Sequence, residues 1–283
     1  MPTIIAVTGD LHVNSTVALC PPDAEIDDNV GIRISKVQRW IWGNWKRYWE
    51  TVAAERERAG AELVVVLNGE LADDNHHVTY QLLTKNPLHQ MDNAVKALQP
   101  MLDILKDKDR VYVTRGTEAH SGPSAWMDEK IAADIGAVGD PATGWSLSPR
   151  RKPPQGASSW WQLETVWDGV RCLAAHHPPG GGGKDPEARA RWAIAQAGRF
   201  VKMRTDADMP IPRLVFWGHV HNPADSGNAY RKCRVIVHPA WQLKTVYGYR
   251  IGGDPLPIGG GWALVDRGRI EKVETCYHEI LIR

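Results

Sequence analysis

The chain lacks the features that would place it in a special class of protein. Its 283 residues carry a formal net charge of only +1, which gives no global reason to expect binding to nucleic acid or to a membrane surface. No apolar run approaches the roughly 20 residues that a membrane-spanning helix needs. The start, Met1-Pro2-Thr3, also lacks the basic segment of a secretory signal peptide. We therefore expect a globular protein of the cytoplasm with no membrane partner.

Cysteine and phenylalanine are both scarce. The four cysteines are far apart in the sequence and include no Cys-x-x-Cys pair, which argues against a disulfide framework and against a thiolate zinc site. Only 2 phenylalanines stand beside 13 tryptophans. Tryptophan favours half-buried and interface positions, and its ring can stack on nucleic-acid bases. A tryptophan-rich core is the first expectation, and exposed stacking tryptophans are the alternative.

Apolar periodicity predicts alternating strands and helices in the first half of the chain. The expected strands are 3–9, 63–67 and 110–114, and the expected helices are 34–58, 88–105 and 125–135. This order is typical of α/β units, in which ligands bind beyond the carboxyl ends of the strands. The first helix has four tryptophans between residues 40 and 49, so it could be a homo-oligomer face or a packed outer layer. Trp40 falls on its basic side.

The second half has mostly strand-like patterns. The expected strands are 160–167, 170–175, 213–217, 231–238, 245–251, 261–265 and 270–282, with one helix near 186–203. Two packed sheets flanked by helices accommodate both halves. The sequence therefore predicts a single α/β domain over 1–283, with 137–157 as a loop within it.

Candidate metal ligands follow five of the apolar runs. They are Asp10-Leu11-His12, Gly69-Glu70, Gly116-Thr117-Glu118-Ala119-His120, His176-His177-Pro178 and Gly218-His219-Val220-His221. Alternate residues of a strand share a face, so each i, i+2 pair can point into one pocket. Carboxylates with imidazoles suit borderline divalent metals such as Zn²⁺, Mn²⁺ or Fe. A single histidine after a strand is usually a hydrogen-bonded surface residue, but five such clusters indicate a metal centre.

The order and spacing of these motifs resemble the calcineurin-like metallophosphoesterases. The consensus of that family runs Asp-x-His, Gly-Asp, Gly-Asn-His, His before Pro, and Gly-His-x-His. The resemblance implies a four-layer α/β/β/α sandwich of two packed mixed sheets, with two divalent ions (Mn, Fe, Zn or Ni) at the strand carboxyl ends. Carried over by position, it implies that Asp10, His12 and His221 hold the first metal and that His176 and His219 hold the second.

Two middle motifs depart from the family pattern. Glu70 stands where a bridging aspartate is usual, and Asp73 or Asp74 could compete for that role, although a polar loop is the simpler interpretation of Asp73–His77. In the third motif we expect Glu118 to replace the asparagine ligand. His120 would then be the catalytic histidine, shifted by one inserted residue. The competing alignment puts Thr117 in the asparagine position.

The resemblance implies a metal-dependent phosphoric ester hydrolase. A hydroxide generated at the metals would attack phosphorus, while His120 donates a proton or hydrogen bond to the leaving oxygen. We favour a phosphodiesterase acting on a nucleotide or single-stranded nucleic acid, because Trp40, Trp126 and the basic surface residues suit such substrates. The alternatives are a non-catalytic metal-binding scaffold of the same fold, motivated by the altered middle motifs, and a Mn-dependent nuclease.

Several further residues are candidates for substrate contacts. Arg115 precedes the third motif, His177 follows His176, and Lys184 ends the glycine-rich segment 180–184. That segment lacks the Gly-Lys-Ser/Thr pattern of a Walker loop, so we interpret it as either a mobile rim beside the metals or a plain flexible loop. His76 and His77 are weaker candidates for hydrogen bonds to the ligands, as is His177. The run 150–152 fits either a solvated turn or a nucleic-acid patch.

Overall fold

Two five-stranded mixed sheets form the centre of the computed structural model, which describes residues 1–74, 81–141, 156–180, 185–250 and 255–280. The first sheet has the order β12-β11-β1-β4-β5 and the second β6-β7-β8-β10-β9. The strands of the first are β1 (Thr3–Thr8), β4 (Glu62–Asn68), β5 (Arg110–Thr114), β11 (Ile258–Asp266) and β12 (Arg269–His278). Those of the second are β6 (Leu163–Trp167), β7 (Val170–Ala175), β8 (Leu214–Trp217), β9 (Ala224–Asp225) and β10 (Arg234–Val237).

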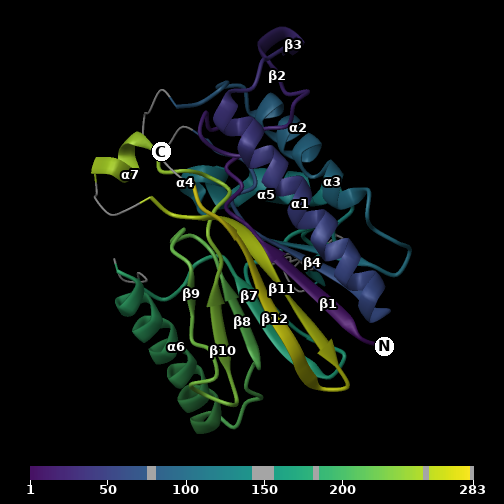
Figure 1. Cartoon of the computed structure of the whole chain (residues 1–283), viewed down its shortest axis with the longest axis vertical. Coiled ribbons are helices and arrows are strands. Elements are labelled where there is room, and N and C mark those ends of the chain that lie inside the picture. The colour runs from purple at the N-terminus through teal and green to yellow at the C-terminus, as the bar shows by residue number, and fades with distance from the viewer. Residues whose placement is uncertain (75–80, 142–155, 181–184, 251–254, 281–283) are drawn as a thin grey trace, which may run out of the picture.

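Three apolar clusters separate four layers. Ile5, Val66 and Phe216 belong to the cluster that joins the two sheets. A second cluster packs α1 (Lys36–Ala59), α2 (Pro87–Ala97), α3 (Gln99–Leu102) and α5 (Trp126–Asp134) on the outer face of the first sheet. A third places α6 (Pro186–Asp206) on the outer face of the second sheet. Figure 1 shows these helices on opposite sides of the sheets. The expected α/β/β/α sandwich is confirmed.

The tryptophan-rich helix α1 owes its bounds and its burial to the local sequence. Ser35 and Gln38 form a reciprocal capping box at its start, and Gly60 takes the left-handed conformation that ends it. Trp45 and Trp49 are fully buried, so these two rings face the core rather than a partner chain. Trp40, a candidate for an exposed stacking residue, instead packs partly buried against the same core cluster.

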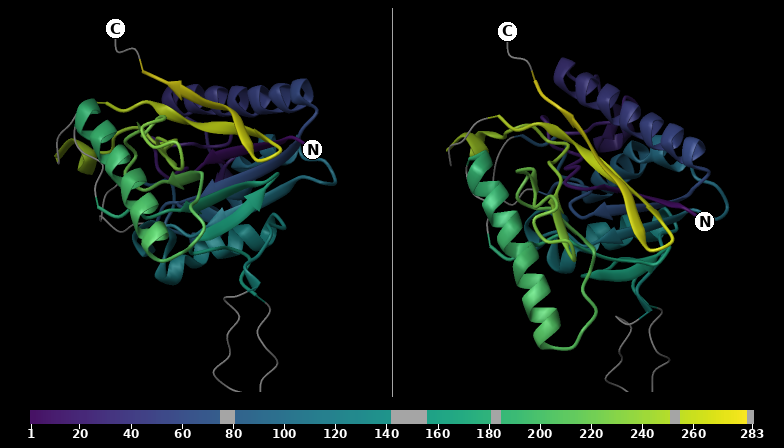
Figure 2. Two further views of the ribbon diagram at one scale, coloured as in Figure 1. Left: turned by 90° about the horizontal axis from the view of Figure 1, so that it is seen from below. Right: turned by 60° about the horizontal axis from the view of Figure 1, so that its bottom comes forward.

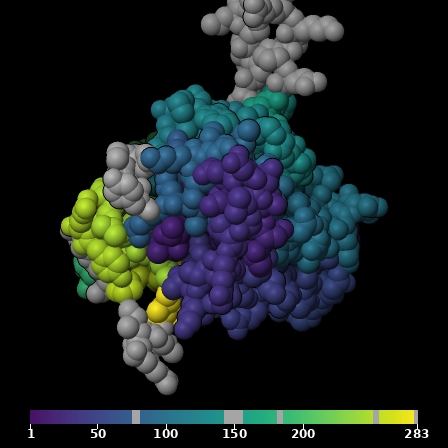
Figure 3. Space-filling view, turned by 90° about the horizontal axis from the view of Figure 1, so that it is seen from above, coloured from purple at the N-terminus to yellow at the C-terminus, as the bar shows by residue number. Residues whose placement is uncertain are grey.

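The expected strand over 245–251 is wrong for the residues that the structure describes. They form the short helix α7 (Val246–Arg250). The carbonyl of Thr245 accepts a hydrogen bond from Tyr249 N at 3.0 Å, and its hydroxyl accepts one from Gly248 N at 3.1 Å. This side-chain cap starts a helical turn despite the alternating apolar pattern, because threonine competes for backbone donors next to it. The segment that contains α7 forms the yellow-green surface beside the purple N-terminal residues in Figure 3.

The remaining elements are small connections. They are the hairpin β2 (Glu25–Ile26) and β3 (Val30–Gly31), the one-turn helix α4 (Glu118–Ser121) that follows β5, and two 3-10 turns, Asp27–Asn29 and Pro123–Ala125. Within the described ranges, no helix is long and apolar enough to cross a membrane.

Parallel pairing sets the position of the motifs. In the first sheet β1, β4 and β5 are parallel neighbours, and in the second β7, β8 and β10 are. The carboxyl ends of neighbouring parallel strands lie at the same edge of a sheet. The five motifs follow β1, β4, β5, β7 and β8. The fold therefore brings together loops that are far apart in the sequence.

Candidate metal centre

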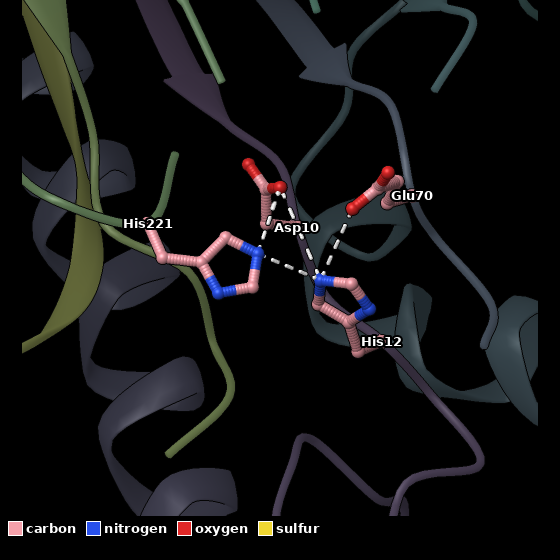
Figure 4. Close-up of side chains that lie close together, drawn as sticks. All are labelled: Asp10, His12, Glu70 and His221. Atoms are coloured by element: carbon pink, nitrogen blue, oxygen red, sulfur yellow. Dashed lines mark hydrogen bonds and ion pairs between the residues drawn. The ribbon is translucent and has the colours of Figure 1, made fainter. Parts of the chain in front are cut away.

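A first group of four possible ligands lies at the ends of β1, β4 and β8. Its members are Asp10, His12, Glu70 and His221, whose candidate ligand atoms all lie within 4.8 Å of one another. His221 Nε2 is 3.0 Å from His12 Nε2 and 3.2 Å from Asp10 Oδ1, and Glu70 Oε2 is 3.2 Å from His12 Nε2. Figure 4 shows these four side chains converging. Donors in a tetrahedron about 2.1 Å from a cation lie about 3.4 Å apart, so the group fits a metal.

A second group shares Glu70 with the first. Glu70 Oε1 lies 3.1 Å from His176 Nε2 and 3.9 Å from His219 Nδ1. The two oxygens of one buried carboxylate thus face different sets of imidazoles. The structure therefore brings together Asp10, His12, Glu70, His176, His219 and His221, which are six of the seven ligands expected from the sequence.

The candidate ligand residues have a strained backbone. Asp10, His12, Glu70, His219 and His221 all have positive φ, between 46° and 70°. This conformation costs about 1–2 kcal/mol per residue for side chains other than glycine, and it persists where neighbouring contacts hold it. Here Asp10 N donates to Gly69 O at 2.9 Å and His12 N donates to Glu70 O at 3.0 Å. Both carboxylate oxygens of Asp10 accept from His219 N at 3.1 Å.

The glycines of the motifs make room for this packing. A Cβ on Gly69 would lie 2.7 Å from His176 Nδ1, and one on Gly218 would lie 2.8 Å from Asp10 Oδ2. A Cβ on Gly116 would lie 2.5 Å from Glu70 Cγ. Each distance is shorter than real contacts allow, so the glycine in each motif is needed for the close approach of the next loop.

Opposite charges stabilise each other within the group. Burial alone would raise the pKa of the Asp10 carboxyl, but His176 and His221 hold it below its usual value. Burial opposes charge on Glu70 too, yet His176 and His12 keep the pKa of Glu70 well below its usual range. Glu70 and Asp10 in turn raise the pKa of His176 to about 9, against the effect of burial. In the ion-free protein, protons on the imidazoles balance the buried carboxylates, and a cation would replace them.

The hydrogen bonding of His176 also suits coordination of a metal. His176 Nε2 is fully buried and lies 3.1 Å from Glu70 Oε1, but it makes no well-aligned hydrogen bond among the described residues. Its other nitrogen, Nδ1, lies 2.7 Å from Asn68 O. A backbone carbonyl at one nitrogen fixes the ring and leaves the other free to coordinate. Imidazole and carboxylate donors suit Zn²⁺, Mn²⁺, Fe and Ni²⁺.

His120 lies beside the first group and is held by Asp73. Its Nδ1 is 2.6 Å from Asp73 Oδ1, and its ring meets that of His12 edge-on at 4.7 Å. Asp73 also lies 3.6 Å from His12 Nδ1. Burial opposes ionisation of Asp73, but the nearby imidazoles of His12 and His120 lower its pKa to about 2. Asp73 is thus buried, and it contacts the site in a way that the polar-loop interpretation missed.

The third motif differs from the alignment that the sequence led us to prefer. Glu118 does not approach either ligand group, because its Oε1 accepts a hydrogen bond from Ser124 N at 2.9 Å. Thr117 contacts the site instead. Its hydroxyl donates to Glu70 Oε1 at 2.5 Å, and its backbone N lies 3.3 Å from the same oxygen. The alternative that places Thr117 in the asparagine position therefore fits the structure.

Asp128 is a supporting residue that sequence reasoning did not identify. It is fully buried on α5 and accepts four hydrogen bonds, from Glu70 N, Leu71 N, Gly116 N and Ser121 Oγ, at 2.8–3.2 Å. It therefore ties the second motif loop to the third. Its only signal in the sequence was an acidic residue near the start of a predicted helix, which is an ordinary position for a solvated carboxylate.

The expected substrate residues are placed in different ways. Arg115 is held by Glu129 Oε2 at 3.1 Å and Ser159 Oγ at 2.9 Å, and its guanidinium lies 5.0 Å from the ring centre of Trp161. His177 stacks obliquely near His219, with ring centres 4.9 Å apart. Lys184, His76, His77 and the run 150–152 lie outside the described residues.

Comparison with known proteins gives only distant similarities. Neither a protein-family model nor a curated protein sequence matches the chain. One similar solved structure is a conserved protein from Streptococcus pneumoniae described as a predicted phosphoesterase. It has 10% identity and a TM-score of 0.36 over 97% of this chain and 89% of that one. The sulfate thiohydrolase SoxB from Thermus thermophilus, in complex with glycerol, has 10% identity and a TM-score of 0.42 over 97% of this chain and 56% of that one.

Wild-type Vps29 from Entamoeba histolytica, complexed with Zn²⁺, has 10% identity and a TM-score of 0.41 over 96% of each chain. These values are too low to transfer an activity to this chain. The strand order of the two sheets and the five motif loops at the strand ends describe the fold without reference to these structures. With its two packed mixed sheets, its flanking helices and its ordered Asp/His/Glu motifs, the chain has the α/β/β/α architecture that its resemblance to the calcineurin-like metallophosphoesterases implied.

Proposed function

We propose that the chain is a metal-dependent phosphoesterase with two divalent cations, and that its preferred substrates are phosphodiesters of nucleotides or nucleic acids. One observation carries the proposal: Glu70 presents one oxygen to His12 and the other to His176 and His219. A carboxylate between two imidazole groups is suited to hold two cations at once.

The ligand assignments follow from the two groups. Asp10, His12 and His221 would hold one cation, His176 and His219 the other, and Glu70 would bridge them. Mn, Fe, Zn and Ni all suit these donors. When bound, such cations lower the pKa of water and neutralise charge on the phosphoryl oxygens.

His120 is our candidate for the catalytic residue. A carboxylate on Nδ1 fixes the orientation of the ring and favours a proton on that nitrogen. When both ring nitrogens carry a proton, Nε2 is the atom that can donate a hydrogen bond or proton to the leaving oxygen. His120 is partly exposed, with 21% of its side chain accessible, so a substrate can reach it.

Exposed aromatic side chains near the third motif support the proposed preference for nucleotide or nucleic-acid substrates. Trp126 is 39% exposed and Trp161 is 45% exposed. Arg115 connects them, because its guanidinium lies over Trp161 and its Nη1 donates to Ser124 O at 3.3 Å, two residues before Trp126. Indole rings at the edge of a site can stack on nucleobases, each stack contributing about 1–3 kcal/mol.

The test is a hydrolysis screen of metal-depleted protein supplied separately with Mn²⁺, Fe²⁺, Zn²⁺ and Ni²⁺. The substrates are bis-p-nitrophenyl phosphate, p-nitrophenyl phosphate, cyclic nucleotides and linear dinucleotides. We expect turnover that depends on added metal, a metal content of two ions per chain, and a higher kcat/KM for diesters than for monoesters. Protein that binds no transition metal and hydrolyses none of these esters would refute the proposal.

His120→Ala distinguishes an enzyme from a scaffold of the same fold. We expect the variant to keep its two metals and to lose at least about 100-fold in kcat, in line with the removal of a general acid. Glu118→Gln is the matched control from the same short helix, and its kcat should stay within about twofold. A further arm with labelled DNA and RNA oligonucleotides tests the nuclease alternative, which cleavage of single strands with Mn²⁺ would favour.

A further inference from the structure

A cavity of about 250 Å³ lies away from the metal ligands. Its walls come from Arg213 before β8, from the connection between β9 and β10, and from residues 270–273 of β12. The ligand His219 follows the other end of β8. Six residues of extended chain at about 3.3 Å each place the cavity about 20 Å from the metal centre. Figure 2 turns this end of the molecule forward and shows the yellow β11–β12 hairpin beside the green strands of the second sheet.

Positive charge is concentrated in this cavity. Arg213, Arg231 and Arg234 line it, together with Lys272, whose ammonium is paired with Glu274 Oε1 at 3.1 Å, and with one carboxylate, that of Glu271. Glu271 is itself ion-paired with Arg269 at 3.3 Å. Because the whole chain carries a formal charge of only +1, the cluster does not reflect a generally basic surface.

Two of these cations are free to bind a ligand. Within the described ranges, the guanidinium groups of Arg213 and Arg231 make no hydrogen bond or ion pair. Arg234 is positioned by a two-pronged ion pair, with Nε 2.9 Å from Asp225 Oδ1 and Nη2 2.6 Å from Asp225 Oδ2. That pair fixes the plane of its guanidinium and leaves the Nη1 edge for another acceptor.

The rest of the wall is neutral and held in place. Burial raises the pKa of Cys233 to about 12, so its thiol adds no negative charge at neutral pH. Ile270 and Val273 pack against the core between the sheets. Tyr230 sits against α6, where a Cβ on Gly198 would lie 2.6 Å from its hydroxyl. The cations therefore line a fixed surface with a neutral, partly apolar wall.

We infer that this cavity binds a small oxyanion of the phosphate class, carried either as free phosphate or pyrophosphate or on a mononucleotide. Guanidinium groups match phosphate oxygens two at a time, which suits the free Arg213 and Arg231 and the fixed Arg234. The volume is below the roughly 300–1,000 Å³ of sites for larger organic ligands, so it suits one or two phosphate groups. Anion binding at these residues does not require the proposed hydrolysis.

The test is isothermal titration of the full chain, treated with EDTA so that no metal can bind the anion. The probes are orthophosphate, pyrophosphate and 5′-AMP at low ionic strength, with chloride as the monovalent control. We expect saturable binding of at least one phosphate probe, with one site per chain. The double variant Arg213→Ala/Arg231→Ala should bind the phosphate probe at least tenfold more weakly. Lys232 is exposed and lies outside the cavity wall, so the affinity of Lys232→Ala should stay within twofold of the wild type.

Three comparisons complete the experiment. His219→Ala/His221→Ala should bind the probes as the wild type does, since these residues belong to the metal centre. Arg231→Glu reverses the charge at an exposed position and serves as the test if the double variant folds poorly. Its affinity for the phosphate probes should also fall at least tenfold. Tighter binding of 5′-AMP than of orthophosphate identifies a nucleotide as the carrier, and the reverse identifies free phosphate. Undiminished binding in Arg231→Glu, or equal loss in Lys232→Ala, would overturn the inference.

Discussion

Asp73 Oδ1 lies 2.6 Å from His120 Nδ1, although the two residues are 47 positions apart in the sequence. If His120 donates to the leaving oxygen, this contact sets which nitrogen faces the substrate. We expect Asp73→Asn to lower kcat by about 10–100-fold with little change in KM. A misoriented imidazole stabilises the transition state less well but has little effect on substrate binding.

Steady-state kinetics across pH, with metal content measured in parallel, checks this prediction. Asp92→Asn, exposed on α2, is the control and should behave as the wild type does. An Asp73→Asn enzyme with unchanged kcat and an unchanged pH profile would show that the contact is only structural.

The third motif offers a direct comparison of two adjacent residues. Thr117 donates to Glu70 Oε1 and Glu118 turns away to Ser124 N. Thr117→Val keeps the shape of the side chain but removes the hydroxyl, so we expect about 10–100-fold weaker binding of the second metal. Glu118→Gln should leave that affinity within about twofold. Metal titration followed by elemental analysis measures both, and a larger loss in Glu118→Gln would restore the alignment that makes Glu118 a ligand.

Local pattern was enough to predict much of the fold. The strands 110–114 and 170–175 have the expected bounds, and Gly60 ends α1 as expected. Period-2 and period-3.6 patterns reflect burial directly, so long buried elements are readable from the sequence. The convergence of Asp10 and His221, which follow strands of two different sheets, was predicted instead from the resemblance of the motifs to a known family.

Contacts that depend on loop register were not predictable. A shift of one residue along the loop decides whether Thr117 or Glu118 faces Glu70, and an irregular loop has no periodic pattern that would reveal it. Asp73 and Asp128 are buried only because distant segments cover them, and each looks like a solvated carboxylate in its own sequence. Helix α7 formed against its alternating pattern because Thr245 caps it.

Asp128 should be a strong determinant of stability. Its carboxylate accepts hydrogen bonds from three backbone N–H groups of the motif loops and from Ser121 Oγ. Asp128→Asn replaces one acceptor oxygen with an NH₂ group that faces these donors, so we expect a loss of about 2–4 kcal/mol in the free energy of unfolding. Urea unfolding measures the loss. Asp134→Asn, at the end of the same helix, should change stability by less than about 0.5 kcal/mol.

Two glycine substitutions should have opposite effects. Gly218→Ala would push a Cβ to within 2.8 Å of Asp10 Oδ2, so we expect weaker metal binding and lower stability. Gly43 lies inside α1, and a Cβ there would meet no atom within 4 Å, so Gly43→Ala should stabilise the protein by about 0.5–1 kcal/mol. Thermal unfolding with and without metal separates the two effects. A stabilised Gly218→Ala protein with normal metal content would contradict the close approach of Gly218 to Asp10.

His238 should make the stability of the metal-free protein fall in mild acid. It is buried between Phe216 and Tyr277, its Nε2 has no partner among the described residues, and burial lowers its pKa to about 4, with Asp225 acting in the opposite direction. In the unfolded chain its pKa is about 6.5, so between these values the unfolded state binds the extra proton. The stabilisation is therefore complete above pH 6.5 and is lost as the pH falls toward 4.

From pH 7 to pH 5 this one group should remove about 2 kcal/mol from the free energy of unfolding. Urea unfolding in EDTA at both pH values measures the change, and His238→Met should reduce it by that amount. An identical pH slope in the two proteins would show that His238 titrates normally.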